Sequence, residues 1–385
     1  LFLVHPIHPE ATVGVSNGFD NVPVALFYLL ALHGYARARR TGRARRHVAG
    51  ALWTFLAFAF KESGLGIPFS VVAMEQCLGG AWGGPFRRRA AHLAPYLALF
   101  GAYMAFRVHL FGDIGGYKGP TGGSRYFNVD FAMLLWRDLT AIPYMLLVPV
   151  NAKAAQGAYD ALARGLAIAA LLAAALSAFR RRARGRAELF GLLLAATACI
   201  PSVSLLQLST NLQESRHFHI PAAGLGLTLA SLLIAPGVGR ARAGLAAARG
   251  AVVVAALLVL HGLNIRPWNE VAEISEAIPE QVSRYISVLN RDANLVLYGL
   301  DTNHDGVIVG LGPTFKEAIR LRYALFDFFR FHLLVDSRKD QFGQEALDPR
   351  ALRWGTRDYA FEWDPERREV VSRTFALRTI LRDRE

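Results

Sequence analysis

Two histidines and a glutamate, His5, His8 and Glu10, lie in the phrase HPIHPE near the start of the chain, and Asp20 follows shortly after them. Imidazole and carboxylate groups can accept a proton, orient an acceptor hydroxyl or bind a cation. The same groups also occur as hydrogen-bonding partners at a helix end. The phrase alone therefore leaves a catalytic and a structural role open.

A lysine and a glutamate, Lys61 and Glu62, are neighbours at the end of an apolar run. An ammonium group in this place is suited to contact a phosphate, because it offers three donors and a full positive charge. Alternatively, the two side chains neutralise each other while the lysine stem extends along the apolar surface to water. Both interpretations stay open.

A third polar phrase, NLQESRHFHIP, contains Arg216, His217 and His219 and leads directly into an apolar run. The planar guanidinium of Arg216 is suited to a phosphate. His217 and His219 could join His5 and His8 around a metal ion, but no cysteine and no firm ligand spacing accompany them. No cofactor is therefore indicated, and the requirement for a divalent metal stays open.

The elements that must position these residues are apolar. Hydrophobic residues make up 53% of the chain and charged residues only 19%, whereas soluble domains carry about a quarter charged residues. Apolar runs approaching the ~20 residues of a spanning helix predict an all-helical polytopic membrane domain at residues 1–267. The eight predicted spans are Val22–Ala36, Val48–Phe60, Leu65–Leu78, Ala91–Leu110, Ala161–Phe179, Leu189–Leu208, Pro221–Ala235 and Ala251–Ile265. The stretch Phe131–Val150 contains Arg137 and Asp138, so we expect a re-entrant or interfacial helix there.

Positive charge is concentrated in the membrane part of the chain. Residues 1–267 carry 26 Lys and Arg against 10 Asp and Glu, whereas residues 268–385 carry 17 against 20. Arginine-rich loops beside spanning helices mark the cytoplasmic face, which disfavours nucleic acid as the partner. These loops are Arg37–Arg46, Arg87–Arg89, Arg180–Arg186 and Arg240–Arg249. With them inside, the polar phrases fall on or near the outer face.

Residues 268–385 predict a small soluble α/β domain on the extracytoplasmic side. Helical periodicity at Trp268–Leu289 and Thr314–Phe328 alternates with strand-like runs. The strand candidates are Asn294–Leu300, Val307–Leu311, Arg330–Val335, Tyr359–Trp363 and Glu369–Arg373. The phrase DTNHDG opens like a calcium loop, but its twelfth position is Gly312, so we interpret it as a tight turn between strands.

In their order along the chain, the polar phrases resemble those of the GT-C membrane glycosyltransferases. The likeness is greatest to the transmembrane O-mannosyltransferases with tetratricopeptide repeats and to their bacterial relatives. The family phrase HP-x-H-x-E followed by Asp corresponds to His5, Pro6, His8, Glu10 and Asp20. The phrase S-K-E with a later Pro corresponds to Phe60, Lys61, Glu62 and Pro68, with Phe in place of Ser.

Two further stretches carry the same resemblance. The family phrase R-Y-x-Y-x-P corresponds to Arg216 and Pro221, with His217 and His219 at the tyrosine positions. The stretch Pro95–Tyr117, which includes Arg107, is similar to bacterial members. The chain departs from the family in having Gly18 where an Arg is usual, and an α/β domain in place of the repeats.

The resemblance implies transfer of a mannose-like sugar from a polyprenyl-phosphate donor to a hydroxyl of a protein or glycan acceptor. The enzyme would lie in the bacterial cytoplasmic membrane. Arg216, Lys61 and Arg107 would contact phosphate, and Glu10, Asp20, His5 and His8 would serve the acceptor side. Supporting roles would fall to Glu62, His217 and His219. We expect the chain to begin at the end of an upstream helix and to lack the main catalytic acid.

A non-enzymatic membrane protein is the alternative. A transporter places polar residues near the bilayer midplane, often in broken helices. Here the apolar runs consist largely of Ala and Leu, and the polar phrases gather at their ends. An anchor presenting the α/β domain to a partner would need no ordered set of polar phrases. The pattern favours an enzyme, and transport or anchoring stays the alternative.

Overall fold

The structure is a computed structural model that describes residues 1–3, 5–12, 15–82, 85–112, 142, 144–147, 149–150, 158–180, 185–203, 215–233, 240–286, 293–300, 303–304, 307–308, 329–335 and 359–374. Contacts divide the chain into two compact units, Leu1–Ile265 and Arg266–Glu385. Each unit is described by itself.

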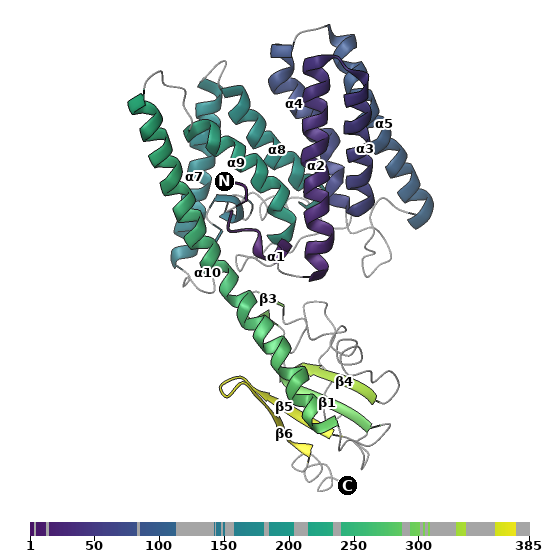
Figure 1. Cartoon of the computed structure of the whole chain (residues 1–385), viewed down its shortest axis with the longest axis vertical. Coiled ribbons are helices and arrows are strands. Elements are labelled where there is room, and N and C mark those ends of the chain that lie inside the picture. The colour runs from purple at the N-terminus through teal and green to yellow at the C-terminus, as the bar shows by residue number, and fades with distance from the viewer. Residues whose placement is uncertain are drawn as a thin grey trace. The chain divides into compact units, whose positions relative to one another are not determined.

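Helices build the first unit and run alternately in opposite directions (Figure 1). Their bounds are α1 Pro9–Thr12, α2 Val15–Thr41, α3 Ala44–Phe60, α4 Ile67–Trp82, α5 Phe86–Phe111, α7 Ala158–Arg180, α8 Gly185–Val203, α9 His219–Leu233 and α10 Arg240–Ile286. Short 3-10 helices, η1 at Glu62–Gly66 and η2 at Ser215–Phe218, precede α4 and α9. Each predicted apolar run falls on one of these helices, so the helical class of this part is confirmed.

The alternation separates charge along the first unit. The arginines of residues 37–46 and 87–89 lie where α2 and α4 end and where α3 and α5 begin, which we call the basic end. Figure 1 draws this end at the top, and α7 and α9 also finish there. The opposite end, called the polar end, carries His5, His8, Asp20, Lys61, Arg216 and His219. The helix α5 ends at the polar end, and α7 begins there. This arrangement is compatible with the prediction that the stretch Phe131–Val150 between them does not cross the membrane.

Small residues allow two helix pairs to approach closely. A Cβ atom added to Gly34 of α2 would lie 2.9 Å from the Cα of Gly50 in α3. One added to Gly191 of α8 would lie 2.7 Å from the carbonyl oxygen of Gly224 in α9. A larger side chain at any of these positions would force the backbones apart. Such small-residue contacts are typical of helices that pack in a membrane.

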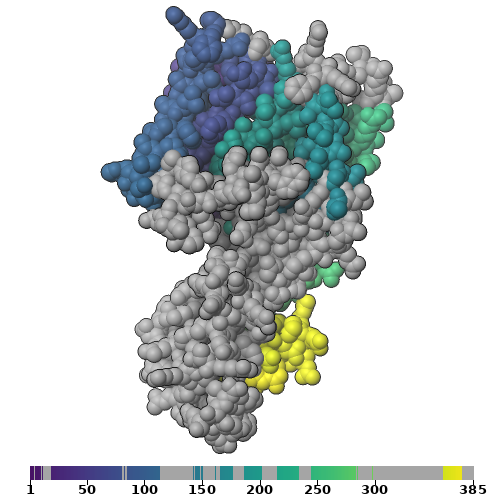
Figure 2. Space-filling model, turned by 180° about the vertical axis from the view of Figure 1, so that it is seen from behind, coloured from purple at the N-terminus to yellow at the C-terminus, as the bar shows by residue number. Residues whose placement is uncertain are grey.

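A chain of hydroxyl groups joins three helices inside the first unit. Thr197 of α8 donates to the carbonyl of Leu193 at 2.8 Å, so it accepts from Ser70 of α4 at 2.7 Å. Ser70 in turn accepts from the buried Tyr28 of α2 at 2.5 Å. Figure 2 shows the same unit from behind, where the blue surface of α4 and α5 lies beside the teal surface of α8 and α9. Burial of apolar side chains is not directional, so these hydrogen bonds fix the orientation of the three helices relative to one another.

The outward-facing side chains of the helices are apolar. Val48, Leu52 and Phe55 form an exposed stripe on α3, with 68%, 51% and 55% of their surfaces accessible. Similar exposed side chains lie along α2, α5, α7 and α10, among them Phe19, Leu26, Leu97, Phe106, Leu172, Leu176, Val252 and Val259. Continuous apolar surface of this kind is unfavourable in water and marks a surface that lipid or protein covers.

Two of the described helices are long and apolar enough to cross a membrane, Phe86–Phe111 and Gly244–Val282. Few of their residues are buried, unlike those of the core helix of a soluble protein. The prediction of eight spans is not confirmed, because only these two of the described helices meet both conditions. Among the others, α3, α4 and α9 are short, with 17, 16 and 15 residues. In the stretch predicted as re-entrant, residues 144–147 form a helical turn whose Tyr144 and Met145 are fully buried. Residues 131–141 lie outside the described part of the chain.

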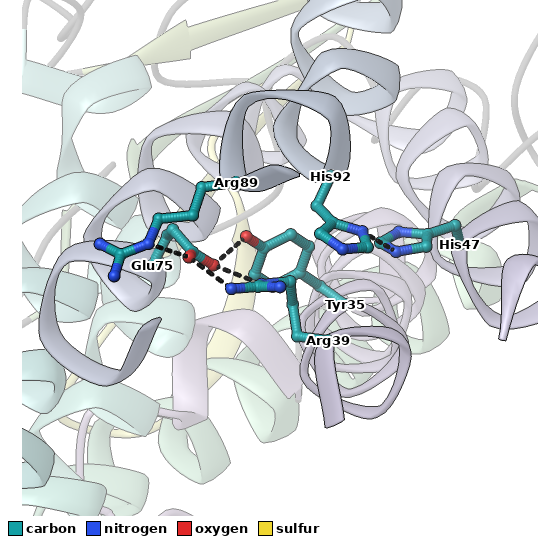
Figure 3. A network of polar contacts seen from close by, with 6 residues as sticks. All are labelled: Tyr35, Arg39, His47, Glu75, Arg89 and His92. Atoms are coloured by element: carbon teal, nitrogen blue, oxygen red, sulfur yellow. Dashed lines mark hydrogen bonds and ion pairs between the residues drawn. The ribbon is translucent and has the colours of Figure 1, made fainter. Parts of the chain in front are cut away.

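A buried carboxylate ties three helices together at the basic end (Figure 3). Glu75 of α4 accepts two hydrogen bonds from Arg39 of α2, at 2.8 and 2.9 Å, and a third from the Tyr35 hydroxyl at 2.5 Å. Arg89 of α5 lies 3.7 Å from the same carboxylate. The side chains of Glu75 and Arg39 are almost completely buried, so neither charge has water as an alternative partner.

A four-stranded sheet in the order β4-β1-β5-β6 forms the second unit. The strands β1 (Ala293–Leu300), β4 (Phe329–Val335) and β5 (Tyr359–Asp364) are parallel, and β6 (Glu369–Ser372) pairs antiparallel with β5. A separate pair, β2 (Asn303–His304) and β3 (Val307–Ile308), leaves two residues between its strands, as the predicted tight turn requires. The predicted helix Thr314–Phe328 lies outside the described residues.

One prediction for the second unit is wrong in detail. We expected the last apolar run and the helix at Trp268–Leu289 to be separate elements, but α10 runs through Pro267 and Pro279 without a break. A proline removes one backbone hydrogen bond, and the remaining bonds of a long helix can carry it. Ile278 and Val282 of α10 are buried, as are Phe361 and Trp363 of β5. Gln281 fastens the helix to the hairpin by accepting from the backbone N–H of Val370 at 2.7 Å.

Replacing Arg39 with glutamine tests the buried ion pair. We expect Arg39→Gln to lower the free energy of unfolding by about 3–5 kcal/mol, because it leaves Glu75 charged and buried without its main partner. The neighbouring exposed residue provides a matched control, and Arg40→Gln should change this free energy by less than about 0.5 kcal/mol. Denaturant unfolding of the purified protein measures both, and equal losses would contradict the assignment.

Candidate functional site

Lys61 is the centre of the polar end. Its ammonium group lies 3.0 Å from the Asp20 carboxylate and donates to the side-chain oxygen of Asn21 at 2.9 Å. The extended backbone of Lys61 terminates α3, whereas Asp20 and Asn21 belong to α2, so the contact closes these two helices together. The sequence left two roles open for Lys61, a contact to phosphate or an ion pair with Glu62. The structure shows an ion pair, but its partner is Asp20 and not Glu62. The second oxygen of Asp20, Oδ1, is buried and has no hydrogen-bond partner.

His219 joins the third polar phrase to the start of α2. Its Nε2 lies 2.8 Å from the carbonyl oxygen of Asn21, and its Nδ1 lies 2.6 Å from that of Arg216. The neutral ring carries one N–H and donates to only one of these oxygens at a time. Burial lowers the pKa of His219 to about 4, although both carbonyl groups favour the protonated ring. His219 precedes the predicted span Pro221–Ala235 and holds the polar phrases together as a neutral group.

His5 has both ring nitrogens engaged by the backbone. Nδ1 accepts from the N–H of Ile7 at 3.3 Å, so Nε2 carries the proton and donates to the carbonyl of Leu146 at 2.8 Å. Burial lowers the pKa of His5 to about 4. This single tautomer is a structural arrangement, and it removes His5 from the candidates for a proton acceptor.

His8 is the second histidine of the first phrase. Its Nε2 donates to the carbonyl oxygen of Phe2 at 2.6 Å, and its ring meets the Phe2 ring edge-on at 4.9 Å. Burial lowers its pKa below the ordinary value. The structure thus keeps both histidines of the phrase neutral near physiological pH.

Two residues of α10 belong to the polar end and were missed from the sequence. Asn264 is buried and donates to the carbonyl oxygens of Pro6 and Pro149, at 2.9 and 2.5 Å. His261 interacts electrostatically with His5 and His8, and its buried Nδ1 has no hydrogen-bond partner. A polar residue in an otherwise apolar run was the available signal, because such residues face the interior of a helix bundle.

The remaining residues that the sequence analysis singled out have fewer contacts with the Lys61 cluster. Arg107 stays on its own helix, where it donates to the Tyr103 hydroxyl at 3.3 Å and stacks against Phe111. Arg216 and His217 lie in η2 and are half-buried. Glu62 begins η1, and the side chain of Glu10 lies outside the described part of the chain.

Within the described residues, no group of three or more His, Cys, Asp or Glu side chains could hold a metal ion. The arrangement of His5, His8, His217 and His219 around a metal therefore has no support. His5 and His219 show why, since the backbone engages both nitrogens of each ring.

Comparison with known proteins found no matching family model, no matching curated protein and no matching solved structure. The chemistry of the polar end must therefore be inferred from its own geometry. Its groups are a partly neutralised lysine, an arginine, neutral histidines and a carboxylate oxygen that is still able to accept a hydrogen bond. Such a set suits a ligand that combines a phosphate with a hydroxyl group.

The neutral histidines predict a loss of stability in acid. His5 and His219 take up protons at an ordinary pKa of 6.5 in the unfolded chain but only near 4 in the folded chain. The unfolded state therefore binds more protons between these values, and stability falls as the pH falls through this range. At pH 5 we expect a loss of about 2 kcal/mol for each histidine relative to pH 7.5.

Unfolding curves at pH 7.5 and pH 5 measure this loss. His219→Gln should reduce the difference between the two pH values, because glutamine does not titrate, whereas Arg40→Gln should leave it unchanged. Equal stability of the unaltered protein at both values would contradict the neutral assignment.

Proposed function

We propose that the first unit is a membrane domain in the bacterial cytoplasmic membrane, with eight spans and a re-entrant segment that includes residues 144–147. The basic end faces the cytoplasm, and the polar end and the second unit are extracytoplasmic. Exposed apolar stripes, close glycine contacts and the arginines gathered at one end support this orientation.

The short helices fit this proposal with a modest mismatch. The 17 residues of α3 extend about 26 Å, a few Å less than the ~30 Å hydrocarbon core. Thinning of the bilayer and extension of flanking Arg and Lys side chains to the interface accommodate such differences.

On this domain we place a glycosyltransferase that moves a mannose-like sugar from a polyprenyl-phosphate donor to an acceptor hydroxyl. One observation carries the proposal: the three phrases that resemble GT-C enzymes meet at the polar end, through contacts of Asp20 with Lys61 and of Asn21 with His219. As many as 198 residues separate these partners along the chain. A lipid-linked phosphate at the membrane surface would reach this depth.

The chemistry is a displacement at the anomeric carbon. The acceptor oxygen forms a bond to this carbon while the bond from the carbon to the phosphate oxygen breaks, and the phosphate leaves with the electron pair. A carboxylate takes the proton of the hydroxyl. Lys61 uses one donor on Asp20 and one on Asn21, so its third N–H remains for the phosphate. Arg216 adds a second cation, and Asp20 Oδ1 can accept from the incoming hydroxyl.

A transfer assay tests the proposal. The full-length protein in membranes receives radiolabelled polyprenyl-phosphate mannose, with a nucleotide sugar as the matched donor control. We expect label to leave the lipid donor only. Lys61→Ala and Arg216→Ala should each reduce transfer by about 100-fold, as loss of a transition-state donor does. Arg40→Gln, which removes a charge at the basic end, should retain activity.

Three outcomes contradict this function. Lack of turnover with several lipid-linked sugars, despite correctly inserted protein, would favour the transport or anchoring alternative. Use of the nucleotide sugar would make the donor assignment wrong. Full activity of Arg216→Ala at normal expression would remove Arg216 from the phosphate role.

A further inference from the structure

The basic end contains more cations than its buried acids, Glu75 and Glu188, can neutralise. Residues 37–46 and 87–89 include nine arginines and no acidic residue. Glu75 is the acid that these arginines contact, and Arg39, Arg89 and Tyr35 already surround it. A second buried acid, Glu188, lies in the first turn of α8. Arg46 lies within electrostatic range of Arg37, Arg43 and Arg45. Mutual repulsion of this kind requires an anion from outside this set.

A histidine pair lies beside the Glu75 cluster (Figure 3). His47 lies in the first turn of α3, directly before Val48 of the exposed stripe, and His92 lies in the second turn of α5. Nε2 of His47 and Nδ1 of His92 lie 2.5 Å apart, and the rings stack with centroids 4.5 Å apart. One ring therefore donates to the other, and the remaining nitrogen of each ring is directed away from this bond.

Buried polar atoms without a hydrogen-bond partner lie on the same two helix starts. The free nitrogens of the pair, Nδ1 of His47 and Nε2 of His92, are buried and make no hydrogen bond. The Nε atom of Arg46 shares this condition, whereas that of Arg89 lies 3.7 Å from the Glu75 carboxylate. In the neutral pair, one of the two free ring nitrogens carries N–H and the other accepts. Buried polar groups are normally satisfied, so these two nitrogens and Arg46 Nε indicate a ligand with both acceptor oxygens and a hydroxyl group.

The helix starts add to the same field. The cap residues of α3 and α5 are Arg43 and Pro85, and neither helix has a side-chain cap. Both helices direct their positive ends to the basic end. Arg88 of α5 reaches to within 3.8 Å of the place where a Cβ on Gly42 would stand, so the α2–α3 turn and the start of α5 are neighbours.

We infer that the basic end binds a phosphate group, held by Arg46 and the His47–His92 pair of α3 and α5 with Arg88 and Arg89 beside them. A phosphate supplies the negative charge and the acceptor oxygens that this set lacks. Its source is either an anionic phospholipid headgroup or a soluble phosphate compound. The site lies at the opposite end of the helices from the proposed transfer site and does not depend on that function.

Two binding measurements distinguish the sources. The first incorporates the full-length protein into nanodiscs of phosphatidylcholine with one tenth phosphatidylglycerol, and native mass spectrometry counts the phosphatidylglycerol that the protein retains. The second titrates inorganic phosphate into nanodiscs of phosphatidylcholine alone and follows heat release. Saturable retention of one phosphatidylglycerol identifies a lipid ligand, and saturable phosphate binding alone identifies a soluble one.

Charge-matched variants locate the site. Arg46→Gln and His92→Gln should each weaken binding of the ligand by about tenfold or more, as loss of a charge-assisted hydrogen bond does. Arg45→Gln removes the same charge from an exposed neighbour and should change affinity by less than about twofold. Circular dichroism monitors folding, and if Arg46→Gln does not fold, His92→Gln and the milder His92→Asn decide.

Two results would overturn the inference. Equal weakening by Arg45→Gln and Arg46→Gln would show diffuse attraction of anions and no site. Absence of saturable binding in both measurements would show that the donors take no phosphate group.

Discussion

The bidentate contact between Arg39 and Glu75 is the interaction on which the arrangement of the first unit depends. It fixes α2 against α4 and, through Arg89, brings α5 to the same carboxylate. Because a helix is rigid, fixing α2 at Arg39 also places Asp20, nineteen residues away, about 28 Å along its axis. There Asp20 meets Lys61, which sits at the end of α3. Two ion pairs at opposite ends of α2 therefore hold this helix in place, one against α4 and the other against the end of α3.

The two ends differ in how they treat charge. At the polar end, Lys61 has a carboxylate partner, and burial keeps His5, His8 and His219 neutral. At the basic end, two buried carboxylates, Glu75 and Glu188, lie near many guanidinium groups, and several buried polar atoms have no hydrogen-bond partner. The charges of the polar end are thus largely balanced, although Asp20 Oδ1 and His261 Nδ1 have no hydrogen-bond partner, whereas the basic end keeps an excess of positive charge. This asymmetry explains why the two ends call for different kinds of binding partner.

Local patterns predicted most of the helical unit, because apolar runs and arginine-rich loops are properties of neighbouring residues. The same patterns identified the strands of the second unit and the hairpin at Asp364, whose carboxylate accepts from the N–H groups of Glu366 and Arg367. The local patterns failed where a contact between residues far apart in the sequence determines the structure. Pro267 gave no sign that α10 would continue, and single residues such as Asn264 and His261 gained meaning only when α10 met the N-terminal segment. The pairing of Lys61 with Asp20, and not with its neighbour Glu62, was likewise invisible along the chain.

The backbones of α2 and α3 approach each other closely where Gly34 meets Gly50. A methyl group there would separate the backbones, and rigid helices would transmit the separation to the contact between Asp20 and Lys61. Substitution of either glycine would therefore disturb the Asp20–Lys61 contact, which lies 14 residues from Gly34 and 11 residues from Gly50, more than two helical turns away. A position that touches no ligand would thus be as intolerant of change as the residues that do.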